Sequence, residues 1–150
     1  FETISFFTNK HFKFLVTEFG FKYSKKQIAK ELYIKLKNEK SELEFITELG
    51  NLTLPIFNFK CFGMNFDLKK LSHGNKLEKI VLENNKRTIP IMNKIIDNYL
   101  ETKEFDQEKW VEDFNEYGKE EIEQFMFEIE KILRENKKVL NGNFLPFIFK

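Results

Sequence analysis

Cysteine is almost absent from this sequence, since Cys61 is the single one among 150 residues. One cysteine excludes a disulfide within the chain and a zinc site built from several cysteines. The sequence also lacks a glycine-rich phosphate loop, a pair of histidines at metal-binding spacing and a serine in a nucleophile elbow. We therefore expect a protein without enzymatic activity, cofactor or metal.

Long apolar runs are missing as well. None approaches the roughly 18–20 residues that a membrane span requires. The first residues lack the basic region, apolar core and small-residue cleavage site of a signal peptide. We therefore expect a cytoplasmic protein with no membrane partner.

Arginine is scarce, since only Arg87 and Arg134 occur in the chain. Arginine is the preferred reader of base edges and phosphates. The lysines are numerous but are spread over many predicted elements. We therefore expect no nucleic-acid partner.

The composition that is present is that of a folded globular protein, with 41% hydrophobic and 33% charged residues. A chain of 150 residues can bury a sizeable core within one domain. We therefore treat residues 1–150 as a single domain.

Three stretches alternate with a period of two, which is typical of strands. The first starts at Ile28 and runs to about residue 37, and the second covers residues 43–49. The third covers residues 52–61 and changes phase beside Pro55, which suggests a bulge or an edge position. Short polar turns between them predict an antiparallel β-meander whose apolar face needs helices to cover it.

Helical spacing marks the two ends of the chain. Residues 5–19 predict a first helix, with Gly20 as its left-handed cap. Thr88 is suited to cap a second helix with Pro90 in its first turn. Residues 76–84 fit either a short helix or a fourth strand. Together these patterns predict an α+β fold with an N-terminal helix, an antiparallel β-meander of three to four strands, and C-terminal helices packed on one sheet face.

The strongest helical pattern covers residues 105–142, with an apolar stripe from Trp110 to Leu140 and one break allowed near Gly118. Asp106 is suited to cap this helix, and Phe105 with Trp110 fits a hydrophobic staple. Asn141 and Gly142 are suited to end it. The apolar tail at residues 144–149 is expected to pack on the core.

Charge is strongly polarised along the chain. Residues 101–130 carry twelve acidic and three basic side chains, a net charge of −9. The other 120 residues carry 22 basic and 12 acidic side chains, a net charge of +10. An ordinary solvated helix face mixes the two signs, so a segment this acidic suggests a basic partner.

Cys61 with His11 or His73 is one conceivable thiol–imidazole pair. Cys61 lies among phenylalanines, however, where a cysteine is usually a small buried apolar residue. We expect His11 to serve packing or the surface, and His73 to lie in a turn.

The order of several short patterns resembles a known family. The first ends an opening helix, two more form a strand pair, a fourth follows the strands, and the last closes the final helix: Phe14–Phe21, Glu31–Ile34, Leu43–Ile46, Phe66–Leu71 and Val139–Phe144. Over roughly residues 10–145 they resemble small bacterial α+β proteins that include immunity proteins of polymorphic toxin systems. The resemblance implies a cognate toxin as partner and no catalytic residues.

The charge pattern and the resemblance lead to one hypothesis. We expect a non-enzymatic immunity protein whose acidic helix face neutralises a basic, nuclease-type toxin domain, because such an enzyme presents a basic cleft for phosphate. Seven residues are the predicted partner-binding site: Glu112, Asp113, Glu116, Tyr117, Glu120, Glu123 and Glu130. The alternative is an accessory or scaffold module that self-associates or binds another protein.

Overall fold

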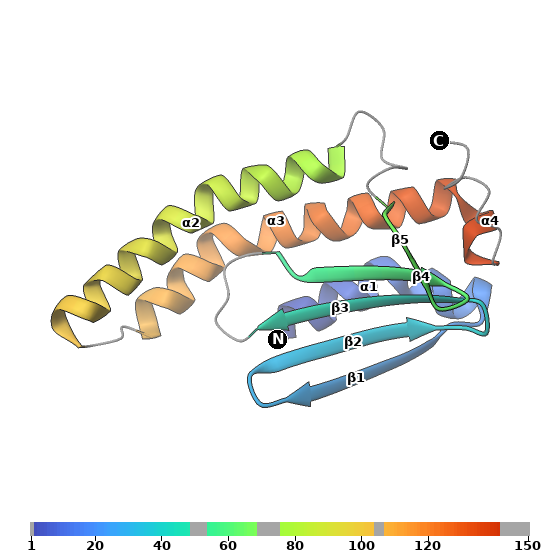
Figure 1. The fold of residues 1–150 in the computed structure, drawn as a ribbon, viewed down its shortest axis with the longest axis horizontal. Coiled ribbons are helices and arrows are strands. Elements are labelled where there is room, and N and C mark those ends of the chain that lie inside the picture. The colour runs from blue at the N-terminus through green and yellow to red at the C-terminus, as the bar shows by residue number, and fades with distance from the viewer. Residues whose placement is uncertain (1, 49–53, 69–75, 104–106, 142–150) are drawn as a thin grey trace.

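The computed structural model of the chain (Figure 1) describes residues 2–48, 54–68, 76–103 and 107–141. The side chains of residues 2, 66, 92, 95, 107–118 and 139 are outside that description. The elements follow in the order α1 (Glu2–Phe19), β1 (Lys22–Ile28), β2 (Glu31–Lys37), β3 (Ser41–Glu48), β4 (Ile56–Cys61), β5 (Met64–Phe66), α2 (Lys76–Thr102), α3 (Gln107–Glu135) and α4 (Lys137–Leu140). The α+β class and the antiparallel meander are confirmed.

The sheet has five strands in the order β1-β2-β3-β4-β5, and each pairs antiparallel with its chain neighbour. The prediction of three to four strands was therefore too low. The strand expected to begin at Ile28 starts instead at Glu31, and Ile28 closes the additional strand β1. All seven residues of β1 are exposed, so this edge strand has no apolar alternation for a sequence pattern to detect.

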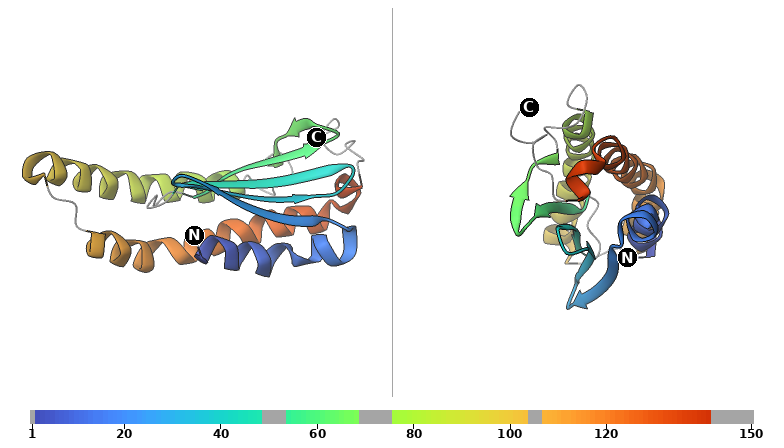
Figure 2. Two further views of the ribbon diagram at one scale, coloured as in Figure 1. Left: turned by 90° about the horizontal axis from the view of Figure 1, so that it is seen from below. Right: turned by 90° about the vertical axis from the view of Figure 1, so that its right-hand side faces the viewer.

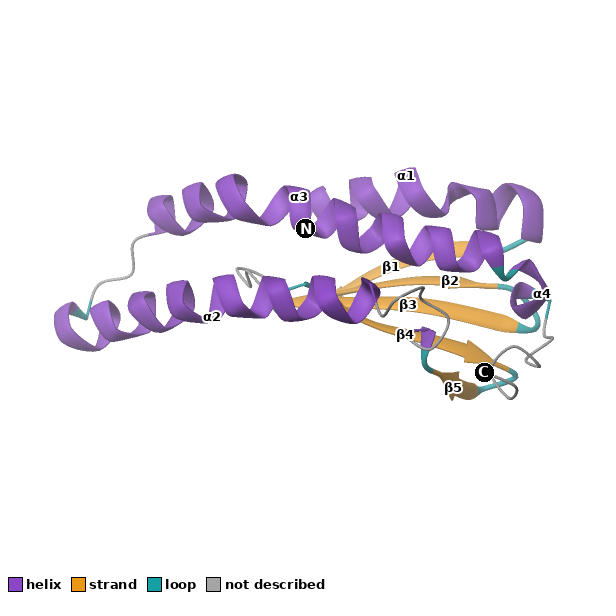
Figure 3. Ribbon diagram, turned by 90° about the horizontal axis from the view of Figure 1, so that it is seen from above, coloured by secondary structure: helices purple, strands orange, loops and turns teal. Residues whose placement is uncertain are grey.

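One face of the sheet is apolar and lies under helices. Across β2 and β3, Ile34 pairs with Phe45, and Phe45 in turn pairs with Phe57 of β4. Phe45 also lies against Phe12 of α1, and Phe57 lies against Phe125 of α3, each pair with ring centroids 5.4 Å apart. α1 and α3 therefore cover the same sheet face, with α2 beside α3 (Figures 2 and 3).

Of the third predicted strand, residues 52–61, the part after Pro55 forms β4. Its odd-numbered residues face the apolar side of the sheet. Phe59 and Cys61 of β4 are buried, whereas Ile56 is 65% exposed on the opposite side. A two-residue turn, Phe62–Gly63, then leads into β5, and both residues have positive φ values. That combination defines a type I′ turn, which matches the twist of a hairpin.

α1 ends as the sequence predicts. Gly20 has a φ of 68°, in the left-handed region that favours glycine. The Phe21 amide donates to the Leu15 carbonyl at 3.0 Å, and the Phe21 ring is buried. This cap turns the chain directly from α1 into the sheet.

Residues 76–84, for which the sequence allowed either a short helix or a fourth strand, are helical, because α2 begins at Lys76. The prediction that a helix starts at Thr88 was wrong. Thr88 is buried inside α2, where its hydroxyl donates to the Asn84 carbonyl at 2.8 Å, and Pro90 also lies within the helix. Here the threonine hydroxyl donates to a carbonyl one turn back, as inside a helix, whereas a capping threonine would accept from a backbone amide.

α3 runs unbroken through Gly118, so the break allowed there is absent. The helix ends at Glu135, and the short helix α4 follows, so a single helix to residue 142 was also wrong. The predicted Asp106 cap with its staple, and the packing of the tail at 144–149, lie outside the described residues.

The turn between β2 and β3 contacts the last residues of both α1 and α4. The Asn38 side-chain amide donates to the carbonyl oxygens of Phe19 at 3.2 Å and of Leu140 at 3.3 Å. Its side-chain oxygen accepts from the backbone amides of Lys40 and Ser41. The end of α1, the sheet and the end of α4 therefore meet at one asparagine.

Candidate interaction surface

All seven predicted site residues lie on α3. Because the helix is continuous, the six acidic positions from 112 to 130 fall within roughly 100° around its axis. The side chains of Glu112, Asp113, Glu116 and Tyr117 are outside the described residues, so only their helical positions are known. The structure does describe the side chains of the remaining three: Glu120, Glu123 and Glu130.

Glu123 and Glu130 contact α1. Lys10 donates to Glu123 at 2.5 Å, and His11 Nδ1 lies 2.7 Å from a carboxylate oxygen of Glu130. His11 is only 6% exposed, and its Nε2 lies 3.6 Å from Glu123. Glu130 also accepts from Arg134 one turn later, at 2.6 Å. These two carboxylates therefore help to fasten α1 onto α3, and the packing role expected for His11 is confirmed.

The ionisation of Glu123 follows from these contacts. The Lys10 ammonium donates a hydrogen bond to Glu123 and holds the pKa of that carboxyl below its ordinary value, against the smaller opposing effect of burial. Glu123 is therefore negatively charged at neutral pH. Part of its charge is already balanced within the protein.

Glu121 was not predicted as important, yet it joins α2 to α3. Arg87 contacts it with two nitrogens, at 2.5 Å from Nε and more closely from Nη2, and the Asn84 side-chain amide also donates to it. Asn84 is buried and accepts from the Leu54 amide at 3.3 Å. The sequence signal was Arg87 itself, because one of only two arginines is a natural partner for a carboxylate.

Glu120 is exposed and makes no ion pair with a described residue. It lines a shallow pocket of about 350 Å³ together with His11, Glu123, Gln124 and Phe127. Phe127 is 51% exposed, and its ring lies edge-on to the His11 ring, with centroids 6.2 Å apart. This depression combines carboxylates with an exposed aromatic ring, the mixture that anchors a basic partner.

Phe127 was not predicted, because the helical pattern of the sequence marks only the buried stripe of this helix. That stripe is confirmed at its described positions, all of them buried: Ile122, Phe125, Met126, Ile129, Ile132 and Leu133. Phe127 lies outside the stripe. The signal that could have found it is an aromatic residue on the charged side of an amphipathic helix.

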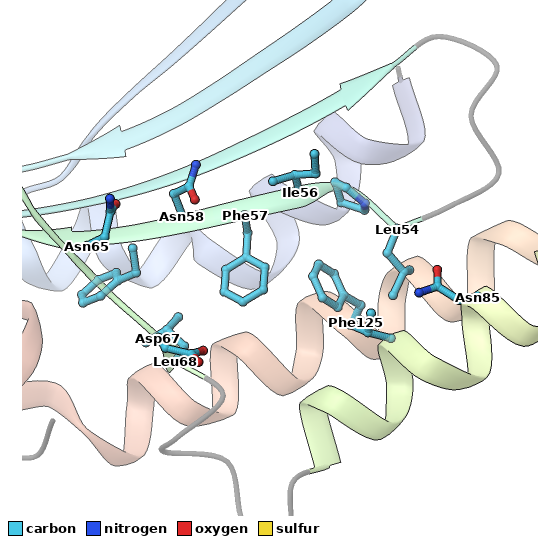
Figure 4. A pocket seen from close by; sticks show the side chains of 12 residues that line it. Leu54, Ile56, Phe57, Asn58, Asn65, Asp67, Leu68, Asn85 and Phe125 are labelled. Atoms are coloured by element: carbon cyan, nitrogen blue, oxygen red, sulfur yellow. The ribbon is translucent and has the colours of Figure 1, made fainter. Parts of the chain in front are cut away.

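A second pocket, of about 530 Å³, lies between β4, β5 and the helices (Figure 4). Leu54, Phe57 and Phe125 form its apolar walls, while Asn58, Asn65, Asp67 and Asn85 supply its polar atoms. Among the described lining residues, the polar groups are three amides and one carboxyl. This pocket is suited to apolar contact.

Cys61, the last residue of β4, is buried. Its sulfur lies 3.6 Å from the Ser41 hydroxyl, and burial raises the pKa of the Cys61 thiol despite that contact. A raised pKa favours the protonated thiol, which is the unreactive form. His73, the conceivable partner, lies outside the described residues. Within the described residues, no three His, Cys, Asp or Glu side chains are grouped as metal ligands.

None of the described helices is long and apolar enough to cross a membrane. The chain matches no protein family model, no curated protein and no solved structure. The resemblance to immunity proteins therefore stays a prediction.

Proposed function

We propose that this chain is a non-enzymatic binding protein that neutralises a basic bacterial toxin domain through the acidic side of α3. The observation that supports this proposal most directly is the continuity of α3. Six acidic positions share one side of an unbroken helix, and the exposed Phe127 lies among the last of them.

The carboxylates of such an interface fall into two sets, one that stabilises the fold and one that contacts the partner. Glu123 and Glu130 hold α1 in place and give the surface a fixed shape. Glu120 is exposed and available to a partner, and the positions 112, 113 and 116 extend the same side of the helix. A concentrated acidic surface of this kind attracts a basic cleft over distance and speeds association.

A nuclease is the toxin class that this surface fits best, because an enzyme that binds phosphate presents a basic cleft. Carboxylates that enter the cleft replace the phosphates of the substrate, and Phe127 supplies apolar contact area beside them. Such an inhibitor acts in the cytoplasm, where the toxin reaches its target.

The test begins with the partner that copurifies with the tagged protein from its native host, followed by binding measurements at increasing ionic strength. Reversing three charges together, in Glu112→Lys/Asp113→Lys/Glu116→Lys, is expected to weaken binding and to flatten its salt dependence. Phe127→Ser is expected to weaken binding while leaving the salt dependence intact.

Glu39→Lys is the matched control, because Glu39 is exposed in the turn between β2 and β3, on a different element from α3. It changes the net charge by the same amount per site. The proposal fails if the triple variant binds with unchanged affinity and unchanged salt dependence, or if the control weakens binding as much per charge.

A further inference from the structure

The helical hairpin of α2 and α3 extends well past the end of the sheet (Figures 1 and 2). The amino-terminal half of α2 lies beside β4, where the Leu54 amide donates to Asn84. The carboxy-terminal half projects beyond the strands. Of the described elements, only α3 accompanies it there.

Five large apolar side chains of α2 are exposed to solvent. Four of them lie on one side and form the α2 stripe: Leu82 at 52%, Ile89 at 50%, Ile96 at 51% and Leu100 at 60% exposed. The fifth, Tyr99 at 46%, lies outside the stripe. Leu77, Asn84 and Thr88, on the side of α2 that packs inward, are almost completely buried. Single exposed apolar residues are ordinary, but a row along one helix marks a contact surface.

The spacing of the stripe specifies the shape of its partner. Leu82, Ile89 and Ile96 are separated by seven residues each, the repeat with which one helix packs along another in a left-handed coil. From Leu82 to Leu100 the stripe is about 27 Å long at 1.5 Å per residue. Its natural occupant is therefore a second helix of similar length.

Three charges beside the stripe would pair with one another if two α2 helices packed antiparallel. Ile89 is the midpoint of α2, which runs from Lys76 to Thr102. Lys79 lies near the start of the helix, and Asp97 and Glu101 lie near its end. All three are exposed, and none forms an ion pair with another described residue. Antiparallel pairing centred on Ile89 places Lys79 of each helix between Asp97 and Glu101 of the other.

We propose that the α2 stripe is the interface of a homodimer, in which two α2 helices pack antiparallel about a two-fold axis at Ile89. A two-fold interface requires one surface that is complementary to itself, and the charges of α2 meet that requirement. The proposal is independent of toxin binding, because it uses α2 and leaves the acidic side of α3 uncovered.

The size of the interface is typical of weak, reversible association. Two stripes of this length bury on the order of 1,000 Å² in total, near the lower limit for specific interfaces. We therefore expect a reversible dimer with a dissociation constant in the micromolar range.

Sedimentation equilibrium of the full chain, from about 1 μM to about 1 mM, measures this constant. Ile89→Glu places two like charges at the two-fold axis and is expected to weaken the dimer by about tenfold or more. Ile56→Glu is the matched control, because Ile56 is 65% exposed on the outer face of the sheet. A monomer throughout this range overturns the proposal, and so does a dimer that tolerates Ile89→Glu.

Charge exchange tests the antiparallel geometry. Lys79→Glu and Glu101→Lys are each expected to weaken the dimer several-fold, because each places like charges opposite one another. The double variant restores a favourable pair and is expected to recover most of the affinity. A double variant that is weaker than both single variants refutes this geometry. Only antiparallel pairing of two α2 helices brings residue 79 of one copy beside residue 101 of the other, so only that pairing is restored by the exchange.

Discussion

Glu121 offers the sharpest test of how the two long helices are held together. Its carboxylate accepts from Arg87 and from the buried Asn84, and both partners belong to α2. Glu121→Ala removes the carboxylate that both donors contact on α3. Breaking a fully buried ion pair costs about 3–5 kcal/mol. Arg87 and Glu121 are 27% and 24% exposed, so water compensates in part, and we expect a loss of about 2 kcal/mol in the free energy of unfolding.

Urea unfolding followed by circular dichroism measures this loss. Glu120→Ala is the control, because it removes the same group from the neighbouring exposed position and is expected to stay within about 0.5 kcal/mol of the parent. Adding Arg87→Ala to Glu121→Ala is expected to cost clearly less than the two single losses combined. Equal effects of Glu121→Ala and Glu120→Ala, or strictly additive losses in the double variant, refute the reasoning.

Three further outcomes follow from other contacts. Gly20→Ala is expected to cost about 1–2 kcal/mol in urea unfolding, because its φ of 68° is unfavourable for a residue with a Cβ atom. Burial and a raised pKa are expected to make Cys61 react with a thiol reagent far more slowly in the native state than in urea, and equal rates contradict this. The folded pKa of Glu123 lies below its unfolded value, so this carboxyl stabilises the fold above about pH 4.3 and loses that effect as the pH falls through the lowered pKa. Lys10→Met is expected to flatten this acid dependence, which unfolding between about pH 3 and pH 6 measures.

The sequence predicted the fold best where burial imposes a clear period. β2 and β3 alternate between buried and half-exposed residues, so their strands and shared face were predictable. The stripe of α3 and the cap at Gly20 were predictable for similar reasons, because packing and the left-handed conformation each select particular residues.

Prediction failed where a segment is shaped by its neighbours. β1 is exposed along its whole length and is a strand because it pairs with β2, for example Lys25 opposite Ile34. Thr88 and Pro90 resemble a helix start, yet the contacts of Asn84 and Leu77 extend α2 well before them. Local propensity is a weak prior when tertiary contacts decide.

The candidate site was predictable only as a concentration of charge. Sequence alone does not separate Glu120, which faces solvent, from Glu123 and Glu130, which are bonded to α1 more than a hundred residues earlier in the chain. That distinction depends on how α1 lies against α3. Glu121 was missed because its role depends on how α2 lies against α3, and Phe127 because it lies outside the buried stripe.

The pairing of His11 with Glu130 has a consequence for how the chain reaches its native state. These residues are 119 positions apart, whereas the five strands pair only with their chain neighbours. Local pairings close quickly, and contacts between distant segments form slowly. During synthesis, the five strands are therefore complete before α3 has been translated. Much of the apolar face of the sheet, which α3 covers in the native state, is then exposed. We expect this nascent sheet to need protection from aggregation until α3 emerges from the ribosome.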